Sequence, residues 1–187
     1  MACLWLAGCA GQPVIEPAQR VDSVDQRLLA PRADAGAGAA AASYRMQPQQ
    51  VFRMPQPVDS ATPQLPADSP RRTLAPTTVC VRVIVTAQGE VARSEALNDR
   101  PECGAGAAPE YADLLRAVHD AIAHWRFVPA AICTYAGPAQ RPAQGGRCDD
   151  AQSVEAVPVT LSYAFTFEVR EGEATVRSGR VGGRGAR

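Results

Sequence analysis

The stretch HWRFVPA, residues 124–130, marks the point where one kind of secondary structure gives way to another. Trp125 completes the apolar stripe of a segment with helical periodicity, and Phe127 begins an extended segment. Pro129 prevents the helix from continuing, because proline lacks an N–H and disfavours helical geometry at the residue before it, Val128. The stretch therefore predicts a helix that ends on a tryptophan and passes directly into a strand.

The segment before this stretch, residues 109–125, is amphipathic. Pro109 and Glu110 are residue types that favour a helix N-terminus. Apolar residues recur every three or four positions, which predicts a helix with one face packed on a sheet. The apolar face carries Tyr111, Leu114, Leu115, Val118, Ile122 and Trp125, and the polar face carries Asp113, Arg116, Asp120 and His124.

Two segments on either side of this helix alternate between apolar and polar residues, as half-buried strands do. Residues 77–97 predict a β-hairpin, because Gly89 suits a tight turn between two alternating runs. Residues 155–171 predict one long strand. The apolar positions are Val79, Val81, Val83 and Val85 in the hairpin and Val157, Val159, Leu161, Tyr163, Phe165, Phe167 and Val169 in the last strand.

The order of these elements, β-β-α-β, predicts an α+β domain over residues 77–171. One helix would pack on a small three-stranded antiparallel sheet. Residues 10–76 are rich in alanine, proline and glutamine and have no sustained burial pattern, so we expect a disordered spacer with one short helical turn at Val24–Ala30. The glycine- and arginine-rich residues 172–187 predict a disordered tail.

The first nine residues contain Leu6-Ala7-Gly8-Cys9, which resembles the lipobox of bacterial lipoproteins. Cys9 would then receive the lipid after export. Only MACLW precedes the box, which is shorter than the apolar run of a secretory signal, so we expect the natural start to lie further upstream. A lipidated Cys9 would anchor the protein to a membrane without a spanning helix.

Six cysteines are present, and four of them, Cys80, Cys103, Cys133 and Cys148, fall in the predicted domain. An even number in a small domain indicates disulfides and an oxidising compartment. Three pairings are possible. We favour Cys80 with Cys103 and Cys133 with Cys148, because each pair closes a local loop; four reduced thiols are the alternative.

The arrangement of these motifs resembles the C-terminal domain of TonB-family energy transducers. The resemblance rests on Val81-Arg82-Val83-Ile84-Val85, on Gly89-Glu90-Val91, on Trp125-Arg126-Phe127-Val128-Pro129-Ala130, and on Val157-Pro158-Val159. The resemblance implies a periplasmic domain that binds a segment of an outer-membrane receptor by β-strand addition. The implied binding edge is the last strand, with Leu161, Ser162, Tyr163, Ala164, Phe165, Thr166 and Phe167, and the implied fold signature is Trp125, Arg126, Phe127 and Pro129.

The lipobox stands where the transducers of that family have a membrane-spanning helix. We therefore interpret the chain as a lipid-anchored, non-enzymatic interaction module in the periplasm, and the resemblance implies a link to TonB-dependent transport. Its expected partner is an envelope protein or receptor segment. Ala10, where an aspartate would indicate the inner membrane, favours the outer membrane. The alternative is a structural envelope lipoprotein that forms a homodimer through the same edge.

Sequence features of enzymes and of nucleic-acid binders are weak. The 19 basic and 19 acidic residues balance, which argues against nucleic acid as a partner. His119 and His124 lie on different faces of the predicted helix, so they do not predict a metal site. A nucleophilic pair of Cys80 and His119 would need a free thiol, which the disulfide prediction disfavours. We expect no catalytic residue, no metal and no cofactor.

Overall fold

The computed structural model describes residues 20–30, 44–65, 69–142 and 147–171. These residues form nine strands, one short α-helix and three short 3-10 helices, labelled η1 to η3. The strands form sheets with the orders β1-β9-β4-β5, β2-β7-β8 and β3-β6. The elements are β1 (Arg20–Leu28), β2 (Gln50–Arg53), β3 (Gln56–Asp59), β4 (Leu74–Val85), β5 (Val91–Ala96), η1 (Pro101–Ala107), η2 (Pro109–Tyr111), α1 (Ala112–Ile122), β6 (Arg126–Val128), β7 (Ala131–Thr134), η3 (Pro138–Gln140), β8 (Ser153–Ala156) and β9 (Val159–Glu171).

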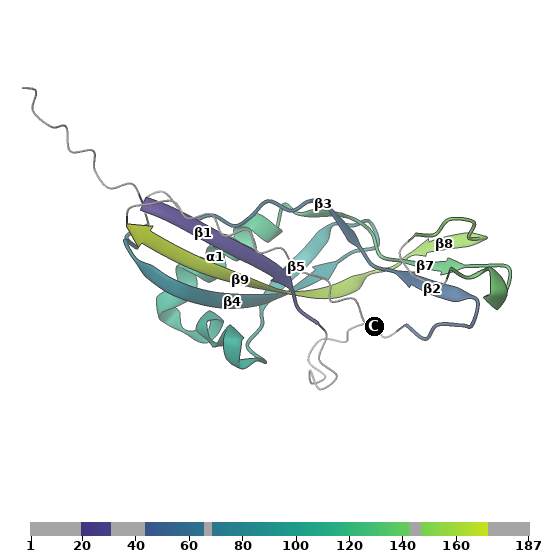
Figure 1. Ribbon diagram of the computed structural model, residues 1–187, viewed down its shortest axis with the longest axis horizontal. Helices are drawn as coiled ribbons and strands as arrows, with labels where there is room; N and C mark the ends of the chain where they lie inside the picture. Colours follow the sequence, from purple (N-terminus) through teal and green to yellow (C-terminus); the bar gives the residue numbers. More distant parts are fainter. Residues whose placement is uncertain (1–19, 31–43, 66–68, 143–146, 172–187) are drawn as a thin grey trace, which may run out of the picture.

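The predicted fold class, α+β with one helix on a three-stranded sheet, is wrong. The described chain is mostly β, and its main sheet has four strands. The three strands expected from the sequence, β4, β5 and β9, do lie together in that sheet, but β1 adds a fourth. Figure 1 shows the four-stranded and three-stranded sheets at opposite ends of an elongated molecule, with β9 running between them.

The main core lies between α1 and one face of the four-stranded sheet. Val79, Val81, Val83 and Val85 of β4 are fully buried there, as the alternation of that segment predicts. Apolar burial of this kind stabilises a fold by about 1.5–3 kcal/mol for each fully buried large side chain. The helix contributes its buried side chains at Leu114, Ala117, Val118 and Ile122.

The segment predicted to be a disordered spacer forms β2 and β3, so that prediction is wrong for residues 44–65. Arg53 pairs with Ala131 and Gln56 with Val128, in one shared register. The ladders β2–β7 and β3–β6 are therefore two parts of one ribbon, interrupted where Pro55 lies opposite Pro129. Proline at such a break costs little, because no ladder hydrogen bond is required there.

Residues 61–65 of the same segment contribute to the core. Leu65 and Pro63 are buried, and the carbonyl of Ala61 accepts a hydrogen bond from Trp125 Nε1 at 2.9 Å. A buried indole N–H needs such a partner. The main core is therefore completed by residues that precede the predicted domain.

The segment between β6 and β9 contains two further strands. β7 and β8 pair antiparallel, from Ala131 with Ala156 to Thr134 with Ser153. The ladder continues in a hydrogen bond from Val157 N to Ala130 O at 2.9 Å. β8 then leads into β9 across Val157 and Pro158.

The helical turn expected at Val24–Ala30 is also wrong, because this part of the chain belongs to β1. The apolar positions 21, 24 and 28 have helical spacing. The structure instead pairs these residues with β9, so tertiary pairing overrides the local pattern. Residues 1–19, including the predicted lipidation site Cys9, and the predicted tail 172–187 lie outside the described residues.

Candidate partner-binding strand

β9 is the longest strand and the predicted binding element. Leu161, Phe165 and Phe167 are 5%, 0% and 1% exposed on the face toward α1, and Tyr163 is half-buried among them. Burial raises the pKa of the Tyr163 hydroxyl. Ser162 and Thr166 lie on the opposite face, half-buried, and Ala164 is buried between them. The strand therefore has an apolar face built into the core and a more polar face.

Both sides of β9 are paired, so β9 is not the edge strand that the sequence predicted. β4 pairs with it from Leu74 opposite Val169 to Val85 opposite Val159. β1 pairs with the other side along nine residues, from Arg20 opposite Glu171 to Leu28 opposite Tyr163. Nearly all of the predicted binding edge is therefore occupied by a segment of the same chain that lies far away in sequence.

The side chains of β1 fit this position incompletely. Val24, opposite Phe167, packs on the main core and is only partly buried. Gln26 lies opposite Phe165, and its buried Oε1 has no hydrogen-bond partner among the described residues. Leu28, opposite Tyr163, is 51% exposed. A buried acceptor without a partner destabilises the state that contains it by about 1–3 kcal/mol.

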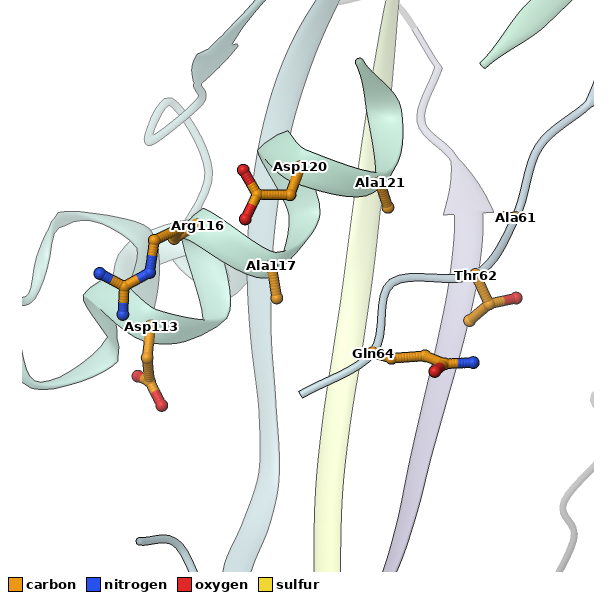
Figure 2. A pocket seen from close by; sticks show the side chains of 8 residues that line it. All are labelled: Ala61, Thr62, Gln64, Asp113, Arg116, Ala117, Asp120 and Ala121. Carbon is orange, nitrogen blue, oxygen red and sulfur yellow. The ribbon is translucent and has the colours of Figure 1, made fainter. Parts of the chain in front are cut away.

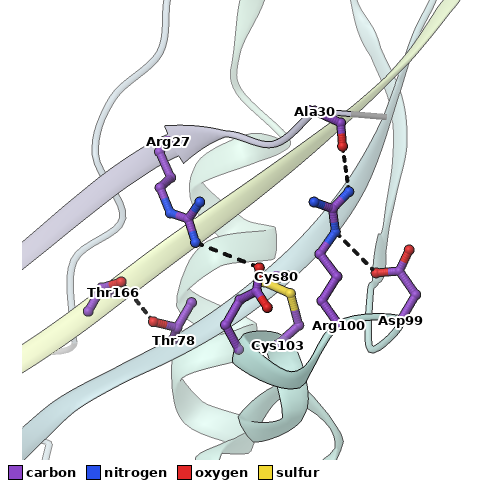
Figure 3. The surroundings of a disulfide bond; sticks show 9 residues. Arg27, Ala30, Thr78, Cys80, Asp99, Arg100, Cys103 and Thr166 are labelled. Atoms are coloured by element: carbon purple, nitrogen blue, oxygen red, sulfur yellow. Dashed lines mark hydrogen bonds and ion pairs between the residues drawn. A yellow bond between two sulfur atoms is a disulfide. The ribbon is translucent and has the colours of Figure 1, made fainter. Parts of the chain in front are cut away.

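The C-terminal end of β1 is fixed more firmly. Leu29 is buried in a second small cluster, and its N–H donates to Ser162 O at 2.7 Å. Arg100 Nη2 donates to Ala30 O at 2.5 Å. Figure 3 shows this contact beside the disulfide Cys80–Cys103. The members of the second cluster are Leu29, Cys80, Leu97, Cys103 and Ala164.

Charged contacts add little to the attachment of β1. Arg27 reaches Glu102 at 4.0 Å, and the two side chains are about half exposed. Exposed pairs of this kind contribute at most about 1 kcal/mol. Among the described side chains, Val24 and Leu29 therefore contribute most to the β1–β9 association, together with the backbone hydrogen bonds and the contact from Arg100 to Ala30.

Trp125 organises the core at the end of α1. Its ring makes edge contacts with Tyr163 and Phe127, at centroid distances of 5.1 and 6.2 Å, and a tilted contact with Phe165 at 6.0 Å. Aromatic pairs in such geometries contribute about 0.5–1.5 kcal/mol beyond their buried area. Trp125 is 1% exposed and Phe127 is 5% exposed. These two signature residues therefore act in the core that supports β9.

The other signature residues connect β6 to its neighbours. Phe127 N donates to Gly89 O at 2.8 Å, and Arg126 forms an isolated bridge with Glu90. Gly89 has a φ of +81°, and a Cβ there would lie 1.9 Å from Phe127 O. Only glycine permits this approach. Pro129 lies at the break of the ribbon, where its carbonyl accepts from Arg53 Nη2 at 3.2 Å.

Both predicted disulfides, Cys80–Cys103 and Cys133–Cys148, are present. The first joins β4 to η1 on the face of the sheet opposite the main core. The second closes the loop between β7 and β8. The two disulfides close loops with sequence separations of 23 and 15 residues. Cross-links of such lengths stabilise a fold by about 3 kcal/mol in the chain-entropy model.

The two histidines have structural contacts. His119 Nδ1 lies 2.6 Å from Ser94 Oγ, which ties α1 to β5, and burial lowers the pKa of His119. His124 is exposed, and its Nδ1 lies 2.9 Å from the carbonyl of Asp120. Cys80 is bonded to Cys103, so the nucleophilic pair of Cys80 and His119 is not formed.

A shallow pocket of about 320 Å³ lies where residues 61–64 cross α1. Figure 2 shows Asp113, Arg116 and Asp120 on the helix side and Thr62 and Gln64 on the other. These mixed charges do not select one class of ligand. Within the described ranges, no group of three or more His, Cys, Asp or Glu side chains could bind a metal ion.

Arg71 fixes the start of β4 to the same helix. It forms two hydrogen bonds of 2.6 Å to the carboxylate of Asp113, donates to Glu110 O, and lies over the ring of Tyr111 at 5.5 Å. The hydrogen bonds from Arg71 lower the pKa of Asp113 below its ordinary value, although burial acts in the opposite direction. The pair is therefore ionised at neutral pH and attaches the segment before β4 to α1.

No protein-family model matches the chain, and neither the curated proteins nor the solved structures include a match. In the part of the chain that the structure describes, no helix has the length and apolar character needed to cross a membrane.

Proposed function

We propose that the chain is a non-enzymatic interaction module of the bacterial envelope that binds an extended segment of a partner protein by β-strand addition to β9. The proposal includes the TonB-like character suggested by the motifs around Trp125 and a lipid anchor at Cys9. The partner is an envelope protein or a segment of an outer-membrane receptor.

The observation that supports this proposal most strongly is the pairing of β9 with β1. A segment separated from β9 by more than 130 residues adds to it antiparallel along nine residues. The backbone of β9 on this side is therefore straight and accessible enough to pair with an added strand. Strand addition obtains its affinity from main-chain hydrogen bonds, which a partner segment would form equally well.

The second supporting observation is the disulfide content. Two disulfides in a small domain are typical of an exported protein, which agrees with a location in the periplasm. The core that supports β9 is apolar and partly aromatic, so it holds β9 as a firmly supported strand.

Photo-crosslinking in cells that express the chain from its own gene tests the binding site. A photoreactive phenylalanine replaces Ser162 or Thr166 on the polar face of β9, and the matched control replaces Arg93 on β5, at the other end of the sheet. We expect one envelope protein to be captured from the first two positions and not from Arg93. Adducts only between copies of the chain would instead indicate a self-associating lipoprotein.

The anchor is tested separately by feeding cells an alkyne-bearing fatty acid. We expect label on the wild-type chain and none on a Cys9→Ser variant. Label that persists in the variant would contradict the lipid anchor at Cys9, whereas the binding site on β9 would be unaffected by that result.

A further inference from the structure

We propose that β1 is a displaceable strand of the chain itself, and that the segment which replaces it is an extended antiparallel peptide with an apolar residue at the position of Gln26. This inference rests on the proposed function and adds to it the state of the site without a partner and the chemistry of the segment that binds.

The backbone of β1 fits its position beside β9 better than its side chains do. β1 forms a continuous ladder with β9, so the main chain is well paired. The side chains that β1 directs toward the main core fit that apolar environment less well. Gln26 places an amide oxygen in a buried position beside Phe165, where the described residues offer no donor. Its partner across the ladder is the aromatic side chain of Phe165, so an apolar side chain would satisfy this position better.

The other residues of β1 indicate which side chains an incoming segment would need. Val24 occupies a partly buried site opposite Phe167, which fits a β-branched or aliphatic residue. Leu29 fills the small cluster beside Cys80 and Ala164. Leu28 is largely exposed and sets no requirement. The preferred partner sequence therefore has apolar residues at the positions of Val24, Gln26 and Leu29, and accepts polar residues between them.

β1 is attached mainly at its C-terminal end. Its last residues are fixed by Leu29 and by the hydrogen bond from Arg100 to Ala30. Its one described ion pair, between Arg27 and Glu102, is exposed. Releasing β1 thus requires removal of Leu29 from its cluster and loss of the ladder, while the β4–β9 ladder and the α1 face of the core remain. A competing strand that forms the same backbone hydrogen bonds and places an apolar residue opposite Phe165 would therefore bind β9 more tightly than β1 does.

The test uses the purified full chain and two fluorescent peptides with the sequence of residues 20–30, one unchanged and one carrying Gln26→Val. Two variants of the chain form a matched pair. Leu29→Asn removes a buried anchor of β1, and Leu28→Asn changes an adjacent, exposed leucine in the same way. Fluorescence anisotropy gives the affinity of each peptide for each chain.

We expect the Gln26→Val peptide to bind about tenfold more tightly than the unchanged peptide. We expect both peptides to bind the Leu29→Asn chain at least about tenfold more tightly than they bind the wild-type chain, because β1 is already loosened in this variant. We expect their affinities for the Leu28→Asn chain to equal those for the wild-type chain. Equal affinities for the two peptides, or for the two variants, would overturn the proposal. So would failure of both peptides to bind the Leu29→Asn chain.

A second variant keeps the test decisive if Leu29→Asn prevents folding. The Gln26→Val chain carries the better residue in its own β1, so we expect it to bind the Gln26→Val peptide about tenfold more weakly than wild type does. Hydrogen exchange provides an independent readout. We expect the amides of β1 to exchange faster than those of β4, and equal protection of both strands would contradict a displaceable β1.

The outcomes separate this inference from the proposed function. Peptide exchange without any envelope adduct in cells would support a displaceable β1 and contradict strand capture from a partner. A specific adduct in cells, with β1 as protected as β4 and no peptide binding, would refute displacement and with it strand addition to β9. The chain would then be an interaction module that binds its partner through another surface.

Discussion

β9 has two neighbours that differ in almost every respect except the hydrogen-bond pattern. Both ladders are antiparallel, and both place a residue beside Phe165. On the β4 side this residue is Val79, which is fully buried; on the β1 side it is Gln26, whose Oε1 is buried without a hydrogen-bond partner among the described residues. Two strands with the same backbone pairing can therefore differ in how firmly they are attached, because their side chains fit the core differently.

The contrast divides β9 into a structural side and an exchangeable side. β4 is joined to the fold by its valines, by a disulfide and by the turn at Gly89. Among the described residues, β1 is attached by Val24, by Leu29, by the hydrogen bond from Arg100 to Ala30 and by its ladder. The same strand can thus belong to a stable core and offer a binding site, provided that the two roles use opposite edges.

The largest expected effect comes from Phe165, which both sides share. Replacing Phe165 with alanine removes its contacts with Trp125 and leaves a cavity in the main core. We expect the free energy of unfolding to fall by about 3–5 kcal/mol. Urea unfolding followed by tryptophan fluorescence measures the change. A loss below 1 kcal/mol would mean that the core between α1 and β9 is not the source of stability.

The next effect separates the two disulfides. Replacing Cys80 and Cys103 with alanine opens a link across 23 residues, and replacing Cys133 and Cys148 opens one across 15. We expect each double variant to lose about 3 kcal/mol. Only the first also disturbs the cluster around Leu29, so hydrogen exchange of β1 should accelerate in that variant and not in the other. Identical exchange of β1 in both would contradict a role for this cluster in fixing β1.

A matched pair of valines tests the two sides of β9 directly. Val79→Ala removes a fully buried side chain on β4, whereas Val24→Ala removes a partly buried one on β1. We expect losses of about 2 kcal/mol for Val79→Ala and less than about 1 kcal/mol for Val24→Ala. Thermal or urea unfolding measures both. Equal losses would show that β1 is as much a part of the cooperative fold as β4.

The sequence predicts the structural side of β9 far better than the exchangeable side. The valines of β4, the stripe of α1 and the alternation of β9 are local patterns created by burial in one core, and they locate those elements correctly. The disulfide pairing follows in the same way, because each bond closes a short loop. None of these features requires knowledge of distant partners.

The strands before residue 65 could not be recognised because their partners lie far away in sequence. In β1, charged residues interrupt the alternation and leave a helical spacing of apolar positions. Pro55, between β2 and β3, and Pro57, within β3, are typical of an extended spacer. Pro57 is tolerated because β3 pairs only with β6 within the described residues. The occupied edge of β9 was missed for this reason, since an edge is defined by what pairs with it.

A smaller effect than that of Val79→Ala is expected at the contact that joins the segment before β4 to α1. Arg71 lowers the pKa of Asp113, so the ionised pair adds stability above the ordinary aspartate pKa of about 3.9. This contribution disappears as the pH falls below that value and through the lowered pKa. We expect Asp113→Asn to cost about 1 kcal/mol at neutral pH, and the difference from wild type to vanish in acid.

Urea unfolding at a series of pH values measures this difference. Asp149→Asn is the matched control, because Asp149 forms an ion pair with Arg147 in which both side chains are mostly exposed. We expect this control to differ little from wild type at every pH. A difference for Asp113→Asn that stays constant down to strongly acid pH would show that the side chain acts through packing rather than through its charge. Arg71 would then attach the segment before β4 through its contacts with the carbonyl of Glu110 and the ring of Tyr111, rather than through the charge of Asp113.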